Sequence, residues 1–365
     1  MTDALVVHGL DLSYFTGKLE AYLRAKGLAY RLAEMDTAAF RRCARTTGIA
    51  QMPQVECPDG TWLTDTTLII RHLERQYREP AMTPADPVVR FVAWLLEDFG
   101  DEALWRPALY YRWACADDAR LLSGRLARGM LRDVPLPFTM RRWFIRTRQR
   151  RLYVRQDGIT AATRHAVEQL YAATLEALTT ALATRPFVLG ERPTEADFGM
   201  FASMFRHFFC DPTPARLMRD GAPAVLEWVA RLWALEPAAF SARPLPSMVP
   251  HEAAPLLALV TSSYLPYLAA NAAAYAAGSR TVTYRDFGAR FTVPVNPYRV
   301  WCLDVLQAAY AALSPAERSA VAGHLGVEAA GTLAAARLSH VPRLVPELPI
   351  QPGAPRSPVG REWRA

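Results

Sequence analysis

Apolar and polar positions at the start of the chain follow the short periods of strands and amphipathic helices. Residues 4–8 form a continuous apolar run, which predicts a strand. An amphipathic helix is expected next, with Leu19 on its buried face and Gly27 at its end. Residues 30–36, "YRLAEMD", predict a second strand, so this part of the chain is expected to form a βαβ unit.

A second unit of two strands and a helix is predicted after a short helical stretch at 37–46. The segments "PQVEC" and "TWLT" flank Asp59-Gly60, a dipeptide that favours a tight hairpin turn. Asp65 or Thr64 is expected to cap the helix that follows. The order βαβ then ββα is that of a thioredoxin-like domain, which we place at residues 1–80.

From residue 87 onward the pattern indicates mostly helices. We expect an all-helical domain over 87–245 and a mostly helical extension with a Pro-rich tail over 246–365. Residues 134–151 read as an insertion, because prolines bound them and aromatic residues mix with Arg. A hairpin turning at Phe287-Gly288 is expected within "TVTYRDFGARFTV". The predicted fold class is therefore α/β plus all-α.

Composition is that of an ordinary globular protein. The 365 residues are enough for two or more domains, and 51% hydrophobic with 21% charged residues allow a sizeable core. The formal net charge is +7, and the basic residues are nearly all Arg, with Lys only at 18 and 26. Such an Arg bias is expected of a protein from a GC-rich bacterial genome, so the charge is weak evidence for an acidic partner.

The five cysteines are scattered along the chain, which favours free thiols in a reducing cytoplasm. No pair has C-x-x-C spacing, and no Cys/His cluster in the sequence suggests a metal site. The longest uncharged run, 253–279, contains two prolines and an Asn, so we expect a buried helical pair there. The expected location is the cytoplasm, with no stable membrane insertion and no nucleic acid partner.

Three hydroxyls lie within four residues at the start of the first predicted helix. The turn "DLSYFTGK" contains Ser13, Tyr14 and Thr16, which either cap the helix or face a ligand. We expect Thr16 to be the cap. The sequence has no Cys at either position 13 or 16, which argues against dithiol redox chemistry.

Residues 1 to about 245 resemble the glutathione transferase superfamily. The block "QMPQVE…DG…LTDTTLIIRHLE" is similar to the family's glutathione site, and "RPTEADFGMF" is similar to the capping motif of its helical domain. The resemblance implies an enzyme that binds glutathione as co-substrate, stabilises its thiolate and conjugates or reduces small hydrophobic electrophiles. The alternative is a catalytically inactive, transferase-like binding or scaffold protein, as in the metaxin-like branch.

The resemblance also implies where glutathione would bind. Met52, before a cis Pro53, would offer its backbone N–H and C=O to the tripeptide as to an added strand. Asp65 would bind the ligand's ammonium, and the Gln51 amide could hold the same end. The γ-glutamyl carboxylate would lie on backbone N–H groups and the Thr66 hydroxyl, where the helix dipole favours an anion. The helix start at residue 65 is therefore expected to face an open cleft.

Catalysis in this family means stabilising the thiolate of glutathione, because a thiol with a pKa of about 8.5 is mostly protonated at neutral pH. A hydroxyl that donates a hydrogen bond to the glutathione sulfur, beside a helix N-terminus, favours the thiolate over the thiol. Alignment with members that carry Cys or Ser at the turn makes Ser13 the catalytic residue. Alignment with tyrosine-dependent members makes Tyr14 the catalytic residue but needs a two-residue deletion. Ser13 is therefore the first choice, and Phe15 packs nearby as part of the glutathione site.

Two further expectations concern partners. The resemblance implies a homodimer, because family members usually pair across a twofold, although the insertion and the extension could block that surface. The stretch "RRWFIRTRQRR", within 134–151, could contact anionic lipid or nucleic acid. We interpret it instead as a solvated helix face whose arginines pair with acidic neighbours.

Overall fold

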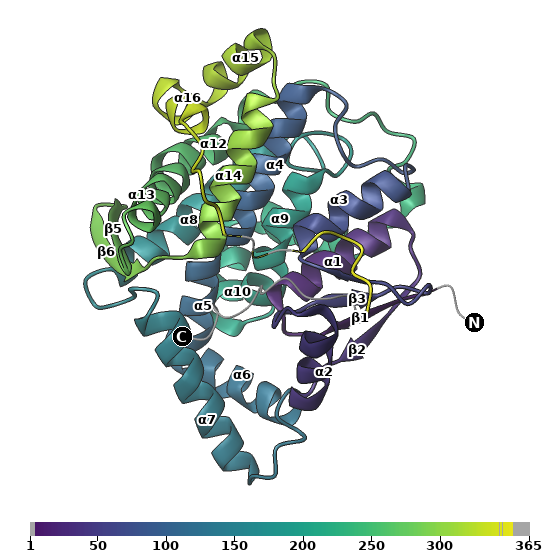
Figure 1. Cartoon of the computed structure of the whole chain (residues 1–365), viewed down its shortest axis with the longest axis vertical. Coiled ribbons are helices and arrows are strands. Elements are labelled where there is room, and N and C mark those ends of the chain that lie inside the picture. Colours follow the sequence, from purple (N-terminus) through teal and green to yellow (C-terminus); the bar gives the residue numbers. More distant parts are fainter. Residues whose placement is uncertain (1–3, 343, 345, 353–365) are drawn as a thin grey trace.

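The N-terminal part of the chain is built around a small mixed sheet. The structure is a computed structural model, and it describes residues 4–342, 344 and 346–352. The strands of this sheet are β1 (Leu5–Gly9), β2 (Tyr30–Glu34), β3 (Gln54–Glu56) and β4 (Trp62–Thr64). Their order is β2-β1-β3-β4, with β1 parallel to β2 and antiparallel to β3. Figure 1 shows this sheet in purple and blue at the lower right of the molecule.

Three helices complete this part and confirm the predicted βαβ-ββα order. They are α1 (Tyr14–Lys26), α2 (Thr37–Thr47) and α3 (Thr66–Gln76). Gly27 ends α1 with φ of 71°, and Gly60 turns the β3–β4 hairpin with φ of 83°. Both angles lie in the left-handed region that glycine adopts without steric cost, which is why these two predicted turns are correct.

The middle of the chain is helical. Its α-helices are α4 (Pro87–Glu102), α5 (Trp105–Ala114), α6 (Ala116–Arg128), α7 (Phe138–Arg150), α8 (Arg164–Ala181), α9 (Glu195–Ser203), α10 (Pro212–Gly221) and α11 (Pro223–Trp233). Helices α4 and α9 approach closely at Gly199, where any side chain would collide with the Glu97 backbone. The α9 start is fixed by a capping box between Thr194 and Asp197, as the sequence predicted.

The extension adds more helices and a hairpin. These elements are α12 (Ala254–Leu259), α13 (Leu265–Ala276), β5 (Thr281–Asp286), β6 (Ala289–Pro294), α14 (Pro297–Ala311), α15 (Pro315–Leu325) and α16 (Val327–Ala334). The hairpin turns at Phe287 and Gly288, with φ of 43° and 76°, so this prediction is confirmed. Figure 1 shows the extension, in green and yellow, covering the upper left of the molecule with α14 beside α4.

The apolar run near residue 253 forms one continuous helical stretch, where the sequence predicted a helical pair. His251–Ala276 is long and apolar enough, by length and composition, to cross a membrane, and 56% of its most apolar window is buried inside the protein. A π-turn at Val260–Tyr264 precedes Pro266. Because proline removes a helical N–H and crowds the preceding turn, the wider π-turn lets the helix continue.

The chain returns to the first sheet after α16. Ile350 pairs with Trp62 of β4 through two antiparallel backbone hydrogen bonds, with N···O distances of 2.9 and 2.8 Å. Ile350 therefore lies against the edge strand of the N-terminal sheet, far in sequence from Trp62 (Figure 1). Together these elements confirm a thioredoxin-like domain followed by helices, the predicted fold class.

Candidate functional site

The turn before α1 places one hydroxyl where a ligand could use it. Ser13 has extended backbone angles, and its Oγ accepts a hydrogen bond of 3.3 Å from the Thr16 N–H, so Ser13 is the N-cap of α1. Its side chain is half-buried, and within the described part of the chain its O–H donates to no group. Ser13 can therefore cap the helix and still donate its proton to a ligand atom.

The prediction that Thr16 caps this helix is wrong. Thr16 is fully buried, its Oγ1 lies 3.4 Å from the Leu10 N–H, and its side chain packs against Gly9. One turn into α1, the side chain points back at the end of β1 and not at the free N–H groups of the helix start. The capping role therefore falls to Ser13, three residues earlier.

Tyr14, the second catalytic candidate, lies inside the protein. Its hydroxyl donates to the backbone carbonyls of Gly100 and Asp101 in α4, and its ring is 2% exposed. Burial raises the pKa of Tyr14 well above its ordinary value, and Asp101 adds to this shift. Phe15 stacks on Trp105 of α5 with ring centroids 6.1 Å apart, which gives the turn an apolar wall.

The loop before β3 has the backbone geometry expected of a peptide-binding edge. The Met52–Pro53 bond is cis, as predicted. Among the described residues, neither the N–H nor the C=O of Met52 has a hydrogen-bond partner. Met52 also packs against the apolar cluster that contains Leu10 and Leu12, which brings this loop beside the turn that carries Ser13.

The start of α3 lies next to this loop. Gln51 donates from its amide nitrogen to the Thr64 hydroxyl at 3.0 Å, directly before Asp65. Asp65 is the N-cap of α3, and its Oδ1 accepts from the Leu68 N–H. Its φ of 68° and ψ of 111° lie outside the regions that non-glycine residues favour, a strain of about 1–3 kcal/mol that proteins concentrate at functional sites.

The expectation of an open cleft at this helix start is wrong, because the extension covers it. Tyr298 of α14 donates its hydroxyl to Asp65 Oδ2 at 2.7 Å, and Asp65 and Thr66 are only 7% and 5% exposed. Burial raises the pKa of Asp65, and the hydrogen bond from Tyr298 opposes that shift. A ligand ammonium could reach Asp65 Oδ2 only by displacing the Tyr298 hydroxyl.

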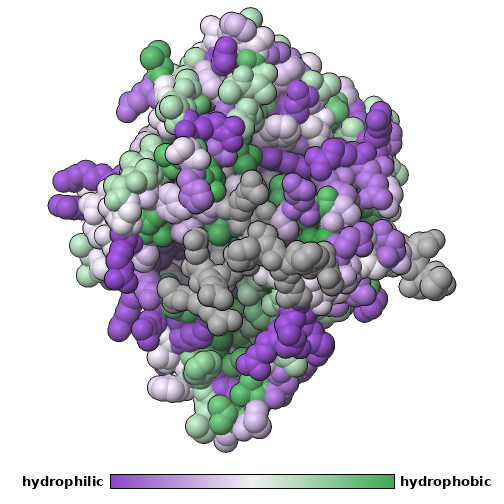
Figure 2. Space-filling model, viewed as in Figure 1, coloured by the Kyte–Doolittle hydropathy of each residue, from purple (hydrophilic) through white to green (hydrophobic). Residues whose placement is uncertain are grey.

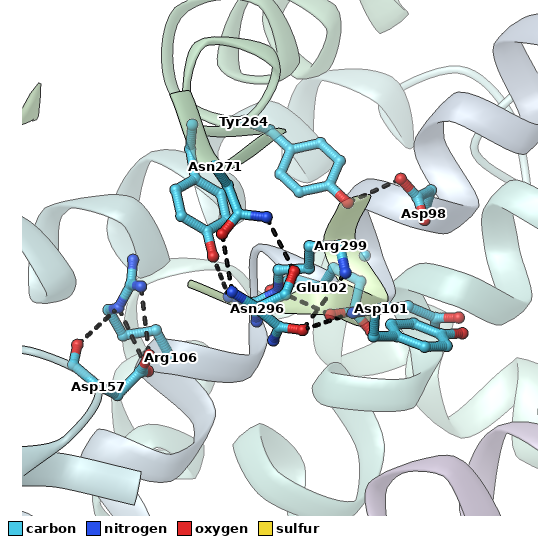
Figure 3. Close-up of polar contacts among 12 residues, drawn as sticks. Asp98, Asp101, Glu102, Arg106, Asp157, Tyr264, Asn271, Asn296 and Arg299 are labelled. Carbon is cyan, nitrogen blue, oxygen red and sulfur yellow. Dashed lines mark hydrogen bonds and ion pairs between the residues drawn. The ribbon is translucent and has the colours of Figure 1, made fainter. Parts of the chain in front are cut away.

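The helix turn that carries Tyr298 is held by polar contacts of its neighbours Asn296 and Arg299, which Figure 3 shows. Arg299 donates to the Glu102 carboxylate at 2.8 Å and to the Glu102 backbone carbonyl at 2.9 Å. Asn296 caps α14 and is bonded in turn by Asn271. Asn296 and Arg299 together fix the first turn of α14. Tyr298 lies between them in this turn, so its position is set by the fold and not by an exposed loop.

A second tyrosine–aspartate pair lies in the same interface, and its Asp98 lines the same small cavity as Tyr298. Tyr264 donates to Asp98 of α4 at 2.7 Å, the same distance as in the Tyr298–Asp65 pair. Burial raises the pKa of Asp98 to about 7. This pair offers a matched control for substitutions at Tyr298 and Asp65.

A buried lysine supports α1 from behind. The Lys18 ammonium is fully buried and donates to Glu97 at 2.7 Å, to Asp101 and to the Thr67 hydroxyl at 3.3 Å. Burial lowers the pKa of Lys18, but the two carboxylates outweigh that effect and place its pKa above the ordinary value. Lys18 therefore joins α1, α3 and α4 through one charge.

Arg112 of α5 fixes the turn itself. Its guanidinium donates to the Leu12 carbonyl at 2.8 Å and to both carboxylate oxygens of Asp211 at 2.6 and 2.9 Å. Sequence reasoning missed Arg112, Lys18 and Tyr298. Only Lys18 carried a signal, as one of two lysines in an Arg-rich chain, on the predicted buried side of an amphipathic helix.

Comparison with known proteins agrees with this arrangement. Residues 7–81 match the model of the glutathione S-transferase N-terminal domain, and residues 161–231 match that of the C-terminal domain. No curated protein matches the chain. Similar solved structures include a glutathione S-transferase from Rhodospirillum rubrum, with 19% identity over 68% of this chain and 98% of that one and a TM-score of 0.44.

Two other solved structures are similar to this chain to about the same degree. The β-etherase LigF from Sphingobium is 19% identical over 65% of this chain and 97% of that one, with a TM-score of 0.46. A glutathione S-transferase from Methylobacterium radiotolerans, in complex with glutathione sulfonate, is 19% identical over 68% and 98%, with a TM-score of 0.39. Residues 7–81 and 161–231 therefore match both domains of the glutathione S-transferase superfamily, in the order N-terminal domain then C-terminal domain.

Proposed function

We propose that this protein is a glutathione transferase-like enzyme that binds glutathione and stabilises its thiolate for attack on small hydrophobic electrophiles. The observation that carries the proposal is the unpaired backbone of Met52 beside cis Pro53, next to a turn where Ser13 has a free proton to donate. Unpaired N–H and C=O groups at such an edge are what an extended peptide uses to bind as an added strand.

Each end of glutathione has a complementary group in this arrangement. The cysteinyl backbone would pair with Met52, and the sulfur would accept a hydrogen bond from Ser13 at the positive end of α1. The γ-glutamyl carboxylate would lie on the first N–H groups of α3 and the Thr66 hydroxyl. Asp65 would pair with the ammonium, and the Gln51 amide oxygen, which accepts no hydrogen bond from a described residue, would accept one from it.

An electrophile would approach from the side of α5. Phe15 and Trp105 form an apolar surface beside the turn, which suits an aromatic or aliphatic electrophile. The cytoplasm remains the proposed location, in line with five free cysteines. The homodimer remains a prediction as well.

Replacing Asp65 with Asn is expected to weaken glutathione binding roughly tenfold, because the ammonium loses its charged partner. The control is Asp98→Asn, which alters the matched tyrosine–aspartate pair without touching the hydrogen bonds of Asp65 and should leave the affinity unchanged. Isothermal titration with glutathione measures both. In the unsubstituted protein the affinity should also fall as the pH falls, because an Asp65 with a raised pKa loses its charge earlier than an ordinary aspartate.

The proposal fails if calorimetry detects no glutathione binding, or if Asp65→Asn and Asp98→Asn affect it equally. A protein that binds no glutathione and conjugates no generic aromatic electrophile would fit the alternative, an inactive transferase-like binding or scaffold protein.

Replacing Tyr298 with Phe is expected to strengthen glutathione binding roughly tenfold. The hydroxyl satisfies Asp65 Oδ2 in the free protein and has to be displaced, so its removal leaves a buried carboxylate that the ligand ammonium can satisfy. Tyr264→Phe removes the equivalent bond to Asp98 and should lower stability similarly without changing glutathione affinity. Equal or weaker binding by Tyr298→Phe would show that Tyr298 does not compete with the ligand.

A further inference from the structure

Helix α7 carries an apolar stripe that faces solvent. Met140, Trp143 and Phe144 are 51%, 65% and 50% exposed, and they follow the three- and four-residue spacing of one helix face. Leu136, just before the helix, is 43% exposed. On the opposite face Ile145 is buried, so the helix is packed on one side and unpartnered on the other within the described structure.

Arginines flank this stripe. By the helical period, Arg146 and Arg150 fall on one side of Trp143 and Arg148 on the other. Residues 138–155 contain seven arginines and no acidic residue, and the remaining 35 basic and 35 acidic residues of the chain balance. The segment therefore accounts for the whole net charge of +7.

Among the described residues these arginines have no acidic partner, which overturns the interpretation of a face neutralised by neighbouring carboxylates. Of the seven, Arg141 donates to the Leu131 carbonyl and Arg142 to the Ser123 hydroxyl, while the side chains of the other five make no hydrogen bond or ion pair with any described residue. The cationic charge is therefore available to a partner. Helix α7 also lies at one end of the molecule's longest axis, where Figure 2 shows hydrophobic side chains gathered at the lower tip.

We propose that α7 is the docking surface of this protein for an anionic lipid bilayer. A helix with Trp, Phe and Met on one face and Arg along its flanks lies in the interface plane, with its apolar side chains at the headgroup–acyl boundary. The arginines contact lipid phosphates, and the Trp ring occupies the interfacial region that suits its amphipathic character. The exposed Met140 and Phe144 beside Trp143 favour lipid over nucleic acid, because a continuous apolar stripe is not needed to bind a phosphate backbone.

The test is flotation of the full chain with vesicles of phosphatidylcholine alone or with about 30% phosphatidylserine, at low and high salt. We expect the protein to float only with the anionic vesicles and to dissociate as salt rises. Trp143→Glu should abolish flotation without changing thermal stability, because the side chain is exposed. The control Val327→Glu alters an 88% exposed apolar residue on α16, at the other end of the molecule, and should float normally.

A second pair of variants isolates the charge. Arg146→Gln with Arg150→Gln should weaken binding roughly 20- to 30-fold, about fivefold for each arginine near the surface. Arg75→Gln with Arg78→Gln, two exposed residues at the end of α3 and on the other side of the molecule from α7, removes equal charge and should leave binding within about twofold, because charges beyond a Debye length of the surface are largely screened. Flotation that survives Trp143→Glu, equal effects of the two arginine pairs, or retention on duplex DNA without flotation would each overturn the proposal.

Discussion

Replacing Lys18 with Met is expected to lower the free energy of unfolding by about 3–5 kcal/mol. The methionine fills a similar volume but leaves Glu97 and Asp101 buried without their shared cation, and an uncompensated buried charge carries a penalty of this size. Urea denaturation followed by far-UV circular dichroism measures the effect. The loss should shrink as the pH falls, because protonation of the two carboxylates removes the unpaired charge.

Neutralising the carboxylates provides the control for this substitution. Lys18→Met combined with Glu97→Gln and Asp101→Asn should recover much of the lost stability, since replacing all members of a buried ionic cluster costs less than removing one. Lys26→Met, at the other lysine, breaks a single pair with Glu74 and should cost less than Lys18→Met. A loss below about 1 kcal/mol for Lys18→Met would show that the cluster is not held by charge.

Replacing Ser13 with Ala is expected to reduce kcat by roughly 10²-fold while glutathione affinity changes little. The hydroxyl bonds more strongly to a thiolate than to a thiol, so its loss affects the reactive form most, as with a missing oxyanion donor. Conjugation of a generic aromatic electrophile measures kcat, and the thiolate absorbance of the bound complex reports the pKa of the sulfur. That pKa should rise in the variant.

Ser13→Gly separates catalysis from helix capping. Glycine at an N-cap costs only a few tenths of a kcal/mol where alanine costs about 1 kcal/mol, yet both substitutions remove the hydroxyl. Both variants should therefore lose the same activity but differ in stability. If Tyr14→Phe abolished turnover while both Ser13 variants retained it, the catalytic hydroxyl would be that of Tyr14, despite its buried position.

The elements predicted correctly from sequence rest on local chemistry. Gly27, Gly60 and Gly288 adopt backbone angles that few other residues tolerate, so each turn is visible in a few letters. The capping box of α9 is equally local, because its two side chains lie three residues apart. Such signals need no knowledge of what packs around them.

The incorrect predictions depended on packing instead. Whether Ser13 or Thr16 caps α1 is decided by where the end of β1 lies, since Gly9 leaves room for the Thr16 side chain beneath it. Asp65 is covered by Tyr298, which lies 233 positions later in the chain. No periodic pattern in the sequence marks these two residues as partners. The arginines of α7 were expected to have acidic neighbours, but their placement at the tip of the molecule leaves them none in the described structure.

The pairing of Ile350 with Trp62 has a consequence for how the molecule avoids self-association. Strand β4 lies at the edge of the sheet, and an uncovered edge is a template on which another chain can add a strand. Ile350 pairs with this edge through one residue pair, so a preparation shortened before Ile350 would leave Trp62 without its backbone partner. During synthesis β4 is therefore made long before the segment that covers it, and the newly made edge stays open until that segment follows.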